Sequence, residues 1–283
     1  MLLAALRDWR RNRILKRSRL DDRLWRDAIS RIPFLRVLST AELARLRELT
    51  VLFLHEKRFS TADGLQLSEA MRLFVAAQAC VLVLELGLDY YRGWGEIILY
   101  PEQFVPRHQH VDESGVVHQG DEPYAGEAWL HGPVILSWAD VEGSGWPDGV
   151  NVVIHEFAHK LDMLNGGANG YPPLHRGMSR EAWSQAFVSA YRDFCARVDG
   201  GEDTVIDPYA SESPGEFFAV LSEAFFETPA VVREEYPTVY EQLRQFYRQD
   251  PIARLGAEAH ILRHRIGHAA RSRAIVNNRK FER

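Results

Sequence analysis

The stretch Val153-Ile154-His155-Glu156-Phe157-Ala158-His159-Lys160-Leu161-Asp162 contains the pattern His-Glu-x-x-His within a run of good helix formers. Residues four apart lie on one face of an α-helix, so His155 and His159 can direct two imidazoles at one point. Glu156 projects from the adjacent position, where it can reach a water near that point without being a ligand. Two histidine ligands and a glutamate general base on one helix are the arrangement of zinc peptidases.

The alternative interpretation is a helix with two partly buried histidines and a solvated glutamate, because a pattern with three fixed positions also arises by chance. The flanking residues favour the metal site. They are mostly apolar, so the helix is expected to be buried, and two histidines and a glutamate buried together need a partner that compensates for their lost hydration. Gly166 and Gly167 end the helix soon after the pattern.

Length, charge and cysteine content restrict the class of protein. A chain of 283 residues can form one full domain with short appendages. Its net charge of −5 argues against direct binding of nucleic acid. The two cysteines, Cys80 and Cys195, are far apart and indicate no disulfide framework, which predicts a cytoplasmic location. No apolar stretch is long enough to predict a transmembrane segment, and no signal-peptide pattern is present.

Local patterns predict a mainly helical α+β protein with a small mixed sheet beside the His-Glu-x-x-His helix. Apolar periodicity and end signals indicate the helices, whereas short apolar runs bounded by turn residues indicate the strands. The predicted helices cover 39–51, 67–88 (one helix or two), 149–164, 179–198, 214–228 and 239–249, and the predicted strands cover 95–101 and 133–138. The segment 165–179 is rich in Gly, Asn and Pro and is predicted to be a long loop, a kind of segment that is often functional.

The chain divides into three predicted parts. Residues 1–31 are crowded with arginines around a short apolar strip, and we interpret them as a basic, solvated helical extension rather than a membrane-surface or docking helix. Residues 32–255 form the predicted metallopeptidase domain, and residues 256–283 form a tail rich in Arg and His. Within the domain, the strand Val134–Trp138 is expected to lie at the edge of the cleft and to pair with an extended substrate backbone.

A catalytic zinc usually takes three protein ligands and a water, so a third donor is expected elsewhere. The position six residues beyond the second histidine is Asn165, which excludes the class with a third histidine there. His175, in the predicted loop, is one candidate. Glu216 and Glu223 are others, because both border the apolar stripe of one predicted helix. The residues alone do not decide which of these two glutamates is the third ligand. Each has another possible role, because Glu216 also completes a capping box with Ser213 and Glu223 also suits the rim of the stripe.

A second metal site is the less favoured interpretation of another group of histidines. One polar stretch contains His108, His110 and His118. Their spacing is not typical of metal ligands, so we interpret them as solvated residues.

The motif helix and the stretch Tyr209–Glu223 together resemble the Mlc titration factor A family of bacterial zinc metallopeptidases. The resemblance extends over roughly residues 32–255. The same metal-site pattern, with a tyrosine seven residues before the ligating glutamate, is also similar to the catalytic domain of anthrax lethal factor. Further stretches similar to the family are Val83–Leu88, Ile98–Pro101, Gly132–Trp138 and Gln245–Pro251.

The resemblance implies a zincin-like fold in which His155, His159 and Glu216 bind one zinc per chain. It implies Glu156 as the general base. It also implies that Tyr209 lines the site, where a phenol hydroxyl can donate a hydrogen bond to the oxyanion of a tetrahedral intermediate.

Two further residues are expected to support the ligands. Asp162, one turn beyond the motif, is expected to orient a ligand histidine, with a helix-end cap as the alternative. Glu223 is then expected to be a supporting or packing residue rather than a ligand.

The resemblance implies a peptidase, with aminopeptidase-like cleavage of short peptide substrates by a zinc-activated water. The alternative is a regulatory binding protein that sequesters a transcriptional repressor, with the zinc site mainly structural or regulatory. The two functions are compatible, and the residues do not distinguish endopeptidase from exopeptidase action.

Overall fold

The computed structural model describes residues 2–103, 109–111, 117–119, 126–128, 132–144 and 146–255. This part of the chain is mainly helical. Its helices are α1 Leu2–Arg17, α2 Asp22–Arg31, α3 Pro33–Arg36, α4 Thr40–Glu56, α5 Glu69–Leu82, α6 Trp138–Gly143, α7 Val152–Asp162, α8 Arg180–Asp199, α9 Pro214–Glu227, α10 Pro229–Glu235, α11 Pro237–Tyr247 and α12 Pro251–Leu255. Short 3-10 helices are η1 Leu88–Tyr91, η2 Met163–Asn165 and η3 Pro208–Ser211.

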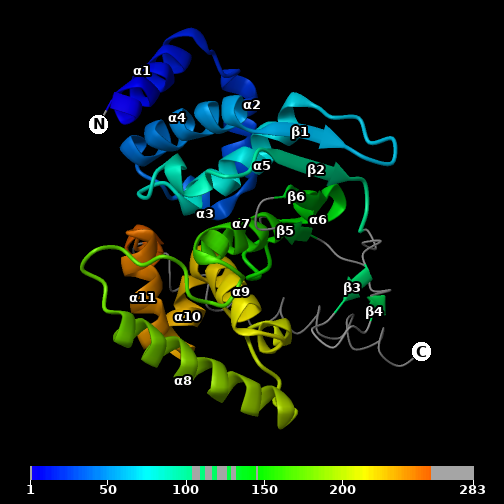
Figure 1. Cartoon of the computed structure of the whole chain (residues 1–283), viewed down its shortest axis with the longest axis vertical. Helices are drawn as coiled ribbons and strands as arrows, with labels where there is room; N and C mark the ends of the chain where they lie inside the picture. The colour runs from blue at the N-terminus through cyan, green and yellow to red at the C-terminus, as the bar shows by residue number, and fades with distance from the viewer. Residues whose placement is uncertain are drawn as a thin grey trace.

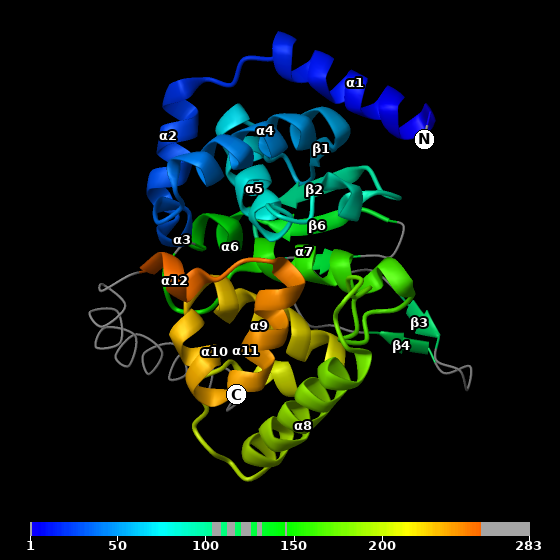
Figure 2. The same ribbon diagram turned by 90° about the vertical axis from the view of Figure 1, so that its left-hand side faces the viewer.

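The elements form two groups with the motif helix between them. Helices α1–α5 and the sheet occupy one end of the molecule, and α8, α10 and α11 occupy the other (Figures 1 and 2). Helix α7 packs against α5 on the first side and against α9 on the second. The His-Glu-x-x-His helix is therefore held from both halves of the molecule.

A four-stranded mixed sheet lies beside α7, in the order β1-β2-β6-β5. The strands β1, β2 and β6 are parallel, and β5 is antiparallel to β6. Their bounds are β1 Arg58–Thr61, β2 Glu96–Tyr100, β5 Gly126–Ala128 and β6 Val134–Ser137, and a separate antiparallel pair is formed by β3 Gln109–Val111 and β4 Val117–Gln119. Helix α7 packs against β5 and β6 (Figure 1), so the predicted small sheet beside the motif helix is confirmed.

The prediction that Val134–Trp138 lies at a cleft edge is wrong. The strand β6 pairs with β2 along one side and with β5 along the other, so its backbone groups are already used. In the described part of the chain, the edge beside α7 belongs to β5 instead. The strand also ends one residue earlier than predicted, because Ser137 accepts a hydrogen bond from Asp140 N–H and caps the short helix α6. The sequence did not predict β1 or β5, since neither run is long enough to show an alternating pattern.

Capping residues set the ends of the predicted helices. Ser39 caps α4, and the carboxylate of Glu42 accepts a hydrogen bond from the backbone N–H of Ser39, which completes a capping box. Ser68 and Ser179 cap α5 and α8 in the same way, through backbone N–H groups three residues on. The helices predicted at 149–164, 179–198 and 214–228 correspond to α7, α8 and α9.

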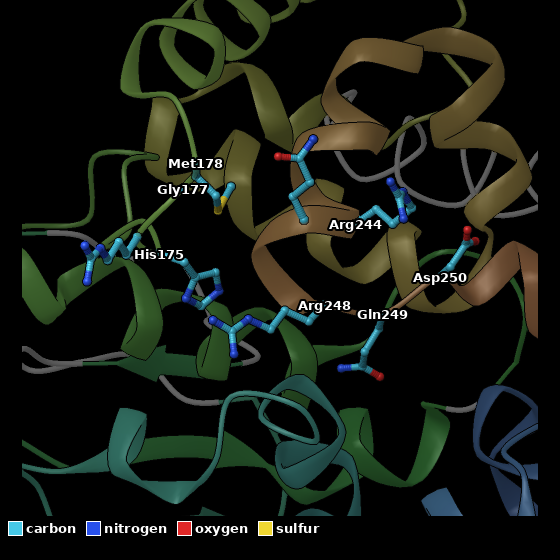
Figure 3. Close-up of a pocket in the computed structure, with 9 residues that line it drawn as sticks. His175, Gly177, Met178, Arg244, Arg248, Gln249 and Asp250 are labelled. Carbon is cyan, nitrogen blue, oxygen red and sulfur yellow. The ribbon is translucent and has the colours of Figure 1, made fainter.

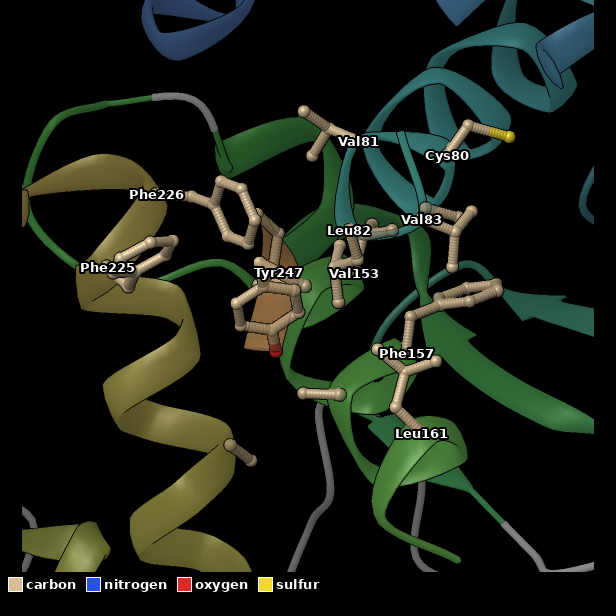
Figure 4. Packing of buried hydrophobic residues seen from close by; sticks show 14 of the residues in the cluster. Cys80, Val81, Leu82, Val83, Val153, Phe157, Leu161, Phe225, Phe226 and Tyr247 are labelled. Atoms are coloured by element: carbon tan, nitrogen blue, oxygen red, sulfur yellow. The ribbon is translucent and has the colours of Figure 1, made fainter. Parts of the chain in front are cut away.

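The apolar side of α7 is fixed by packing at intervals of four residues. Val153, Phe157 and Leu161 are fully buried and face the end of α5 (Figure 4). The ring of Phe157 lies 5.2 Å from that of Tyr91 and 5.6 Å from that of Trp94, centroid to centroid. Because close-packed aromatic and aliphatic side chains resist rotation of the helix, the opposite face of α7 is presented in one orientation.

The basic N-terminal segment forms α1 and packs against α4. Two of its arginines are held by carboxylates of the domain: Arg11 contacts Glu56 at 3.0 Å and Asp89 at 3.1 Å, and Arg7 contacts Asp89 at 2.9 Å. Leu6 and Trp9 remain exposed. Ile14 and Leu15 pack against the core, so α1 contacts the domain through charge pairs and through part of its apolar strip. The rest of the segment, α2, places Trp25 and Ala28 within the core.

No helix within the described ranges is long and apolar enough to cross a membrane. The predicted Arg- and His-rich tail, residues 256–283, lies outside the described residues. So does His108. The backbones of His110 and His118 pair in register between β3 and β4, but their side chains are not described.

Candidate metal centre

Two capped helix ends bring the expected ligands together. Asn151 caps α7 by accepting a hydrogen bond from the N–H of Ile154 at 3.0 Å. Ser213 caps α9 by accepting from the N–H of Glu216 at 3.1 Å, and Pro214 occupies the first helical position. The two helices pack against each other, so the first turn of α9 lies beside the histidine face of α7.

His155, His159 and Glu216 form one cluster, in which the three potential ligand atoms lie within 4.8 Å of one another. Nε2 of His155 lies 3.1 Å from Nε2 of His159 and 2.9 Å from Oε2 of Glu216. The same glutamate oxygen lies 3.2 Å from Nε2 of His159. Throughout the described ranges, no other group of three His, Cys, Asp or Glu residues meets this criterion.

The hydrogen bond at Nδ1 of His155 determines whether its Nε2 carries a proton or a free lone pair. Nδ1 lies 2.7 Å from Oε1 of Glu223. Since a carboxylate accepts, Nδ1 carries the proton and the lone pair of Nε2 is directed into the cluster. That lone pair, a carboxylate oxygen of Glu216 and Nε2 of His159 then converge on one point. Two imidazole nitrogens and a carboxylate oxygen are a typical donor set for a divalent metal, so these residues fit a zinc site.

The electrostatics of the cluster also favour a bound cation. Burial lowers the pKa of His155, but Glu223 and Glu216 outweigh burial and hold that pKa well above its ordinary value. Burial raises the pKa of Glu216, but hydrogen bonds from His155 and His159 outweigh it and keep this pKa far below the usual range. Both shifts show that the carboxylates of Glu216 and Glu223 favour positive charge at this buried point, which a bound cation would supply in place of a proton on His155.

Glu156 lies on α7 between the two histidines and is only 4% exposed. Among the described residues, its Oε2 has no hydrogen-bond partner. Burial raises its pKa to about 7, although the neighbouring His155 and His159 act in the opposite direction. A carboxyl group whose pKa lies near neutrality can both accept and return a proton, which is what a general base requires.

Tyr209 lies at the open side of the cluster. It belongs to η3, which packs against the start of α9. Its ring centroid is 6.0 Å from that of His155, and its side chain is 45% exposed. The aromatic ring therefore borders the ligands from the solvent side.

The sequence model of the glucose-regulated metallo-peptidase M90 family matches residues 6–248 of the chain. The chain belongs to this family. It is 38% identical over 234 residues to Mlc titration factor A from Yersinia pestis (strain Pestoides F), and equally to that from Yersinia pseudotuberculosis serotype O:1b (strain IP 31758). Each alignment covers 82% of this chain and 86% of the relative. The predicted family resemblance is thereby confirmed, and the match to M90 begins within the basic N-terminal segment.

In this M90 chain, Asp162 anchors the loop that follows α7. Its two carboxylate oxygens accept hydrogen bonds from Gly170 N–H at 2.7 Å and Tyr171 N–H at 2.8 Å. Nδ1 of His159 is buried and has no hydrogen-bond partner within the described residues. These contacts support the alternative role of Asp162, a cap at the end of the helix. They do not include a hydrogen bond between Asp162 and His159.

A buried polar network behind His155 was not predicted. The backbone N–H of Asn151 donates to Oε2 of Glu223, and its side-chain amide donates at 2.8 Å to Gln78 and at 2.8 Å to Glu227. The network joins α5, the start of α7 and α9 behind His155. The sequence contains one sign of this network, the polar Gln78 inside an apolar helix, because a buried polar residue needs a buried hydrogen-bond partner.

His175, the other candidate for the third ligand, is not part of the cluster. Its Nε2–H donates to the backbone oxygen of Phe246 at 2.6 Å, and its Nδ1 lies 3.1 Å from the hydroxyl of Tyr90. Both ring nitrogens are therefore used, one by α11 and the other by η1.

Proposed function

We propose that the protein is a zinc-dependent peptidase of zincin-like fold, with one zinc per chain held by His155, His159 and Glu216. The observation that carries the proposal is the convergence of three lone-pair donors beside a buried, near-neutral Glu156. Membership of a metallo-peptidase family supports it.

The residues divide the chemistry among them. Bound zinc would polarise the peptide carbonyl and make the attacking water more acidic. Glu156 accepts a proton from that water and delivers it to the leaving amine. The hydroxyl of Tyr209 donates a hydrogen bond to the carbonyl oxygen as negative charge develops on it. Glu223 holds the proton on Nδ1 of His155, which keeps Nε2 free to bind metal.

For the substrate we propose short peptides, cleaved in an aminopeptidase-like manner. An extended peptide would add to the edge of β5 that no described strand occupies, next to α7 at the end of the sheet. A cytoplasmic location is supported by Cys80 and Cys195, which are both free thiols.

A second candidate function is supported by the name of the relatives, Mlc titration factor A. In this alternative the chain binds and sequesters a transcriptional repressor, and the zinc site is mainly structural or regulatory. The same protein can perform both functions if the repressor surface and the peptide cleft are separate.

The test is Glu156→Gln, assayed for peptide hydrolysis, zinc content and repressor binding. Because the amide is similar in size but is not a base, we expect hydrolysis to fall by a factor on the order of a hundred or more while zinc and repressor binding persist. The matched control is Glu48→Gln, which alters an exposed glutamate of α4. Near-normal hydrolysis by the Glu156 variant would refute the general-base role. A wild-type protein that binds repressor but hydrolyses no peptide would favour the alternative.

A further inference from the structure

A cavity of about 480 Å³ lies where the loop after α7 meets the end of α11 (Figure 3). None of the three residues of the metal cluster lines it. Its volume falls in the range of small-molecule sites. Its lining is cationic, because it contains three arginines and only one carboxylate. These residues are Arg176, Arg244, Arg248 and Asp250.

His175 lines the cavity as an uncharged ring that is held in place. His175 stacks on the ring of Phe246 at 5.7 Å and is fixed through both nitrogens, by the Phe246 carbonyl and the Tyr90 hydroxyl. Burial lowers the pKa of His175, the hydrogen bond to the Phe246 carbonyl acts in the opposite direction, and the nearby charge of Arg248 lowers the pKa further, so it lies below its ordinary value. His175 therefore shapes the cavity without adding positive charge at neutral pH.

Arg248 is held in a backbone conformation that its residue type disfavours. It is the residue that ends α11, with φ 54° and ψ 34°, in the left-handed region. Among the described residues, the only other non-glycine residue with positive φ is Asp63, whose short side chain tolerates this region better. A glycine would end the helix there without steric cost. Figure 3 shows the Arg248 side chain extending toward His175.

The positive charge of the cavity is only partly neutralised. Arg244 is paired with Glu241, with contacts of 2.8 and 2.7 Å. Asp250 is used by the start of α12, where it accepts from the Tyr240 hydroxyl at 2.7 Å and from a backbone N–H. Within the described ranges, the guanidinium groups of Arg176 and Arg248 make no hydrogen bond or ion pair.

The carbonyl end of a helix attracts cations, and this explains part of the arrangement, because Arg244 and Arg248 both lie at the end of α11. It does not explain Arg176, which comes from a different segment and lines the same cavity. Arg176 and Arg248 are exposed, come from separate segments and line one cavity, and within the described ranges neither guanidinium is paired. Together they form a site for a group with paired oxygens.

We propose that this cavity binds a small oxyanion, a phosphate or carboxylate group, through Arg176 and Arg248. Both anion types present two oxygens to a planar guanidinium, so the shared chemistry is bidentate charge-assisted hydrogen bonding. The site extends the chemistry of the protein beyond the peptidase function, and it does not depend on metal in the cluster.

The test is calorimetric titration of the full chain with inorganic phosphate and, separately, with succinate at near-physiological salt. We expect saturable binding of at least one probe, and the tighter probe identifies the anion type. Arg248→Gly removes the guanidinium at a position whose backbone favours glycine, so the fold is retained. Arg248→Gly and Arg176→Gln should each weaken binding by about tenfold or more.

Two controls make the test decisive. Arg180→Gln removes an exposed arginine close by in sequence that does not line the cavity, and it should bind as the wild type does. The double variant His155→Ala, His159→Ala should also retain binding, which separates this site from the metal cluster. The proposal is overturned if neither probe binds saturably, if the cavity variants bind normally, or if either control weakens binding as much as Arg248→Gly does.

Discussion

Oε1 of Glu223 lies 2.7 Å from Nδ1 of His155. Glu216, two turns earlier on the same helix, contacts the opposite nitrogen of the same ring at 2.9 Å. The imidazole of His155 thus lies between Glu216 and Glu223 of α9. Only its Nε2 side also faces His159, so the two glutamates have different surroundings although both border the same apolar stripe.

We expect protein purified without chelator to contain about one zinc per chain. The double variant His155→Ala, His159→Ala should lose it, because two of the three proposed protein ligands are removed. Elemental analysis with parallel circular dichroism checks both the metal and the fold. Equal zinc in the folded double variant would show that the metal binds elsewhere.

Glu216→Ala should lose zinc and activity, whereas Glu223→Ala should keep zinc with an affinity about 10- to 100-fold weaker. The first variant removes a proposed ligand, and the second removes the acceptor that fixes the proton of His155. Zinc titration into each metal-free protein measures the difference.

Glu212→Ala is the matched control for this pair, because Glu212 is exposed and directly precedes Ser213, the residue that caps α9. It should bind zinc as the wild type does. If Glu223→Ala loses the metal while Glu216→Ala retains it, the two roles are reversed.

Glu156 should make the metal-free protein less stable as pH rises. Burial raises its pKa to about 7 in the folded state from 4.5, so between these values the folded protein holds a proton that the unfolded chain releases. Stability from this group is therefore present at low pH and lost as pH rises through 7. Metal-free Glu156→Gln should exceed the wild type by about 2 kcal/mol more at pH 8 than at pH 5. Urea unfolding at both pH values measures this, and an equal difference at both would contradict the shift.

Tyr209→Phe should lower kcat by about tenfold and leave zinc content unchanged, because it removes a hydroxyl proposed to act on the developing oxyanion. KM should change little, since the ring that borders His155 remains. Steady-state kinetics on a short peptide separate the two parameters. Tyr171→Phe, in the loop after α7, is the control. A purely structural Tyr209 would leave kcat as it is in that control.

Two similar sequence patterns show which feature of a helix start a local pattern cannot predict, namely the partner of the glutamate carboxylate. Ser39 and Glu42 form a complete capping box, in which the glutamate carboxylate accepts from the backbone N–H of Ser39 at 2.8 Å. Ser213 caps α9 in the same way, but the carboxylate of Glu216 points to His155 and His159 instead. The sequence pattern is the same in both, and the difference comes from the helix that packs alongside.

The sequence by itself determined that His155, Glu156 and His159 share one helix, because an i, i+4 spacing fixes their relative positions through local backbone geometry alone. It also determined the buried character of that helix and the family of the chain. Only the tertiary structure decided which glutamate faces Nε2 of His155, that β6 is an interior strand, and that Asp162 holds the following loop. These depend on how α9, β5 and the loop pack against α7, and packing between segments far apart in the chain is set by the complementarity of whole surfaces, which no short pattern encodes.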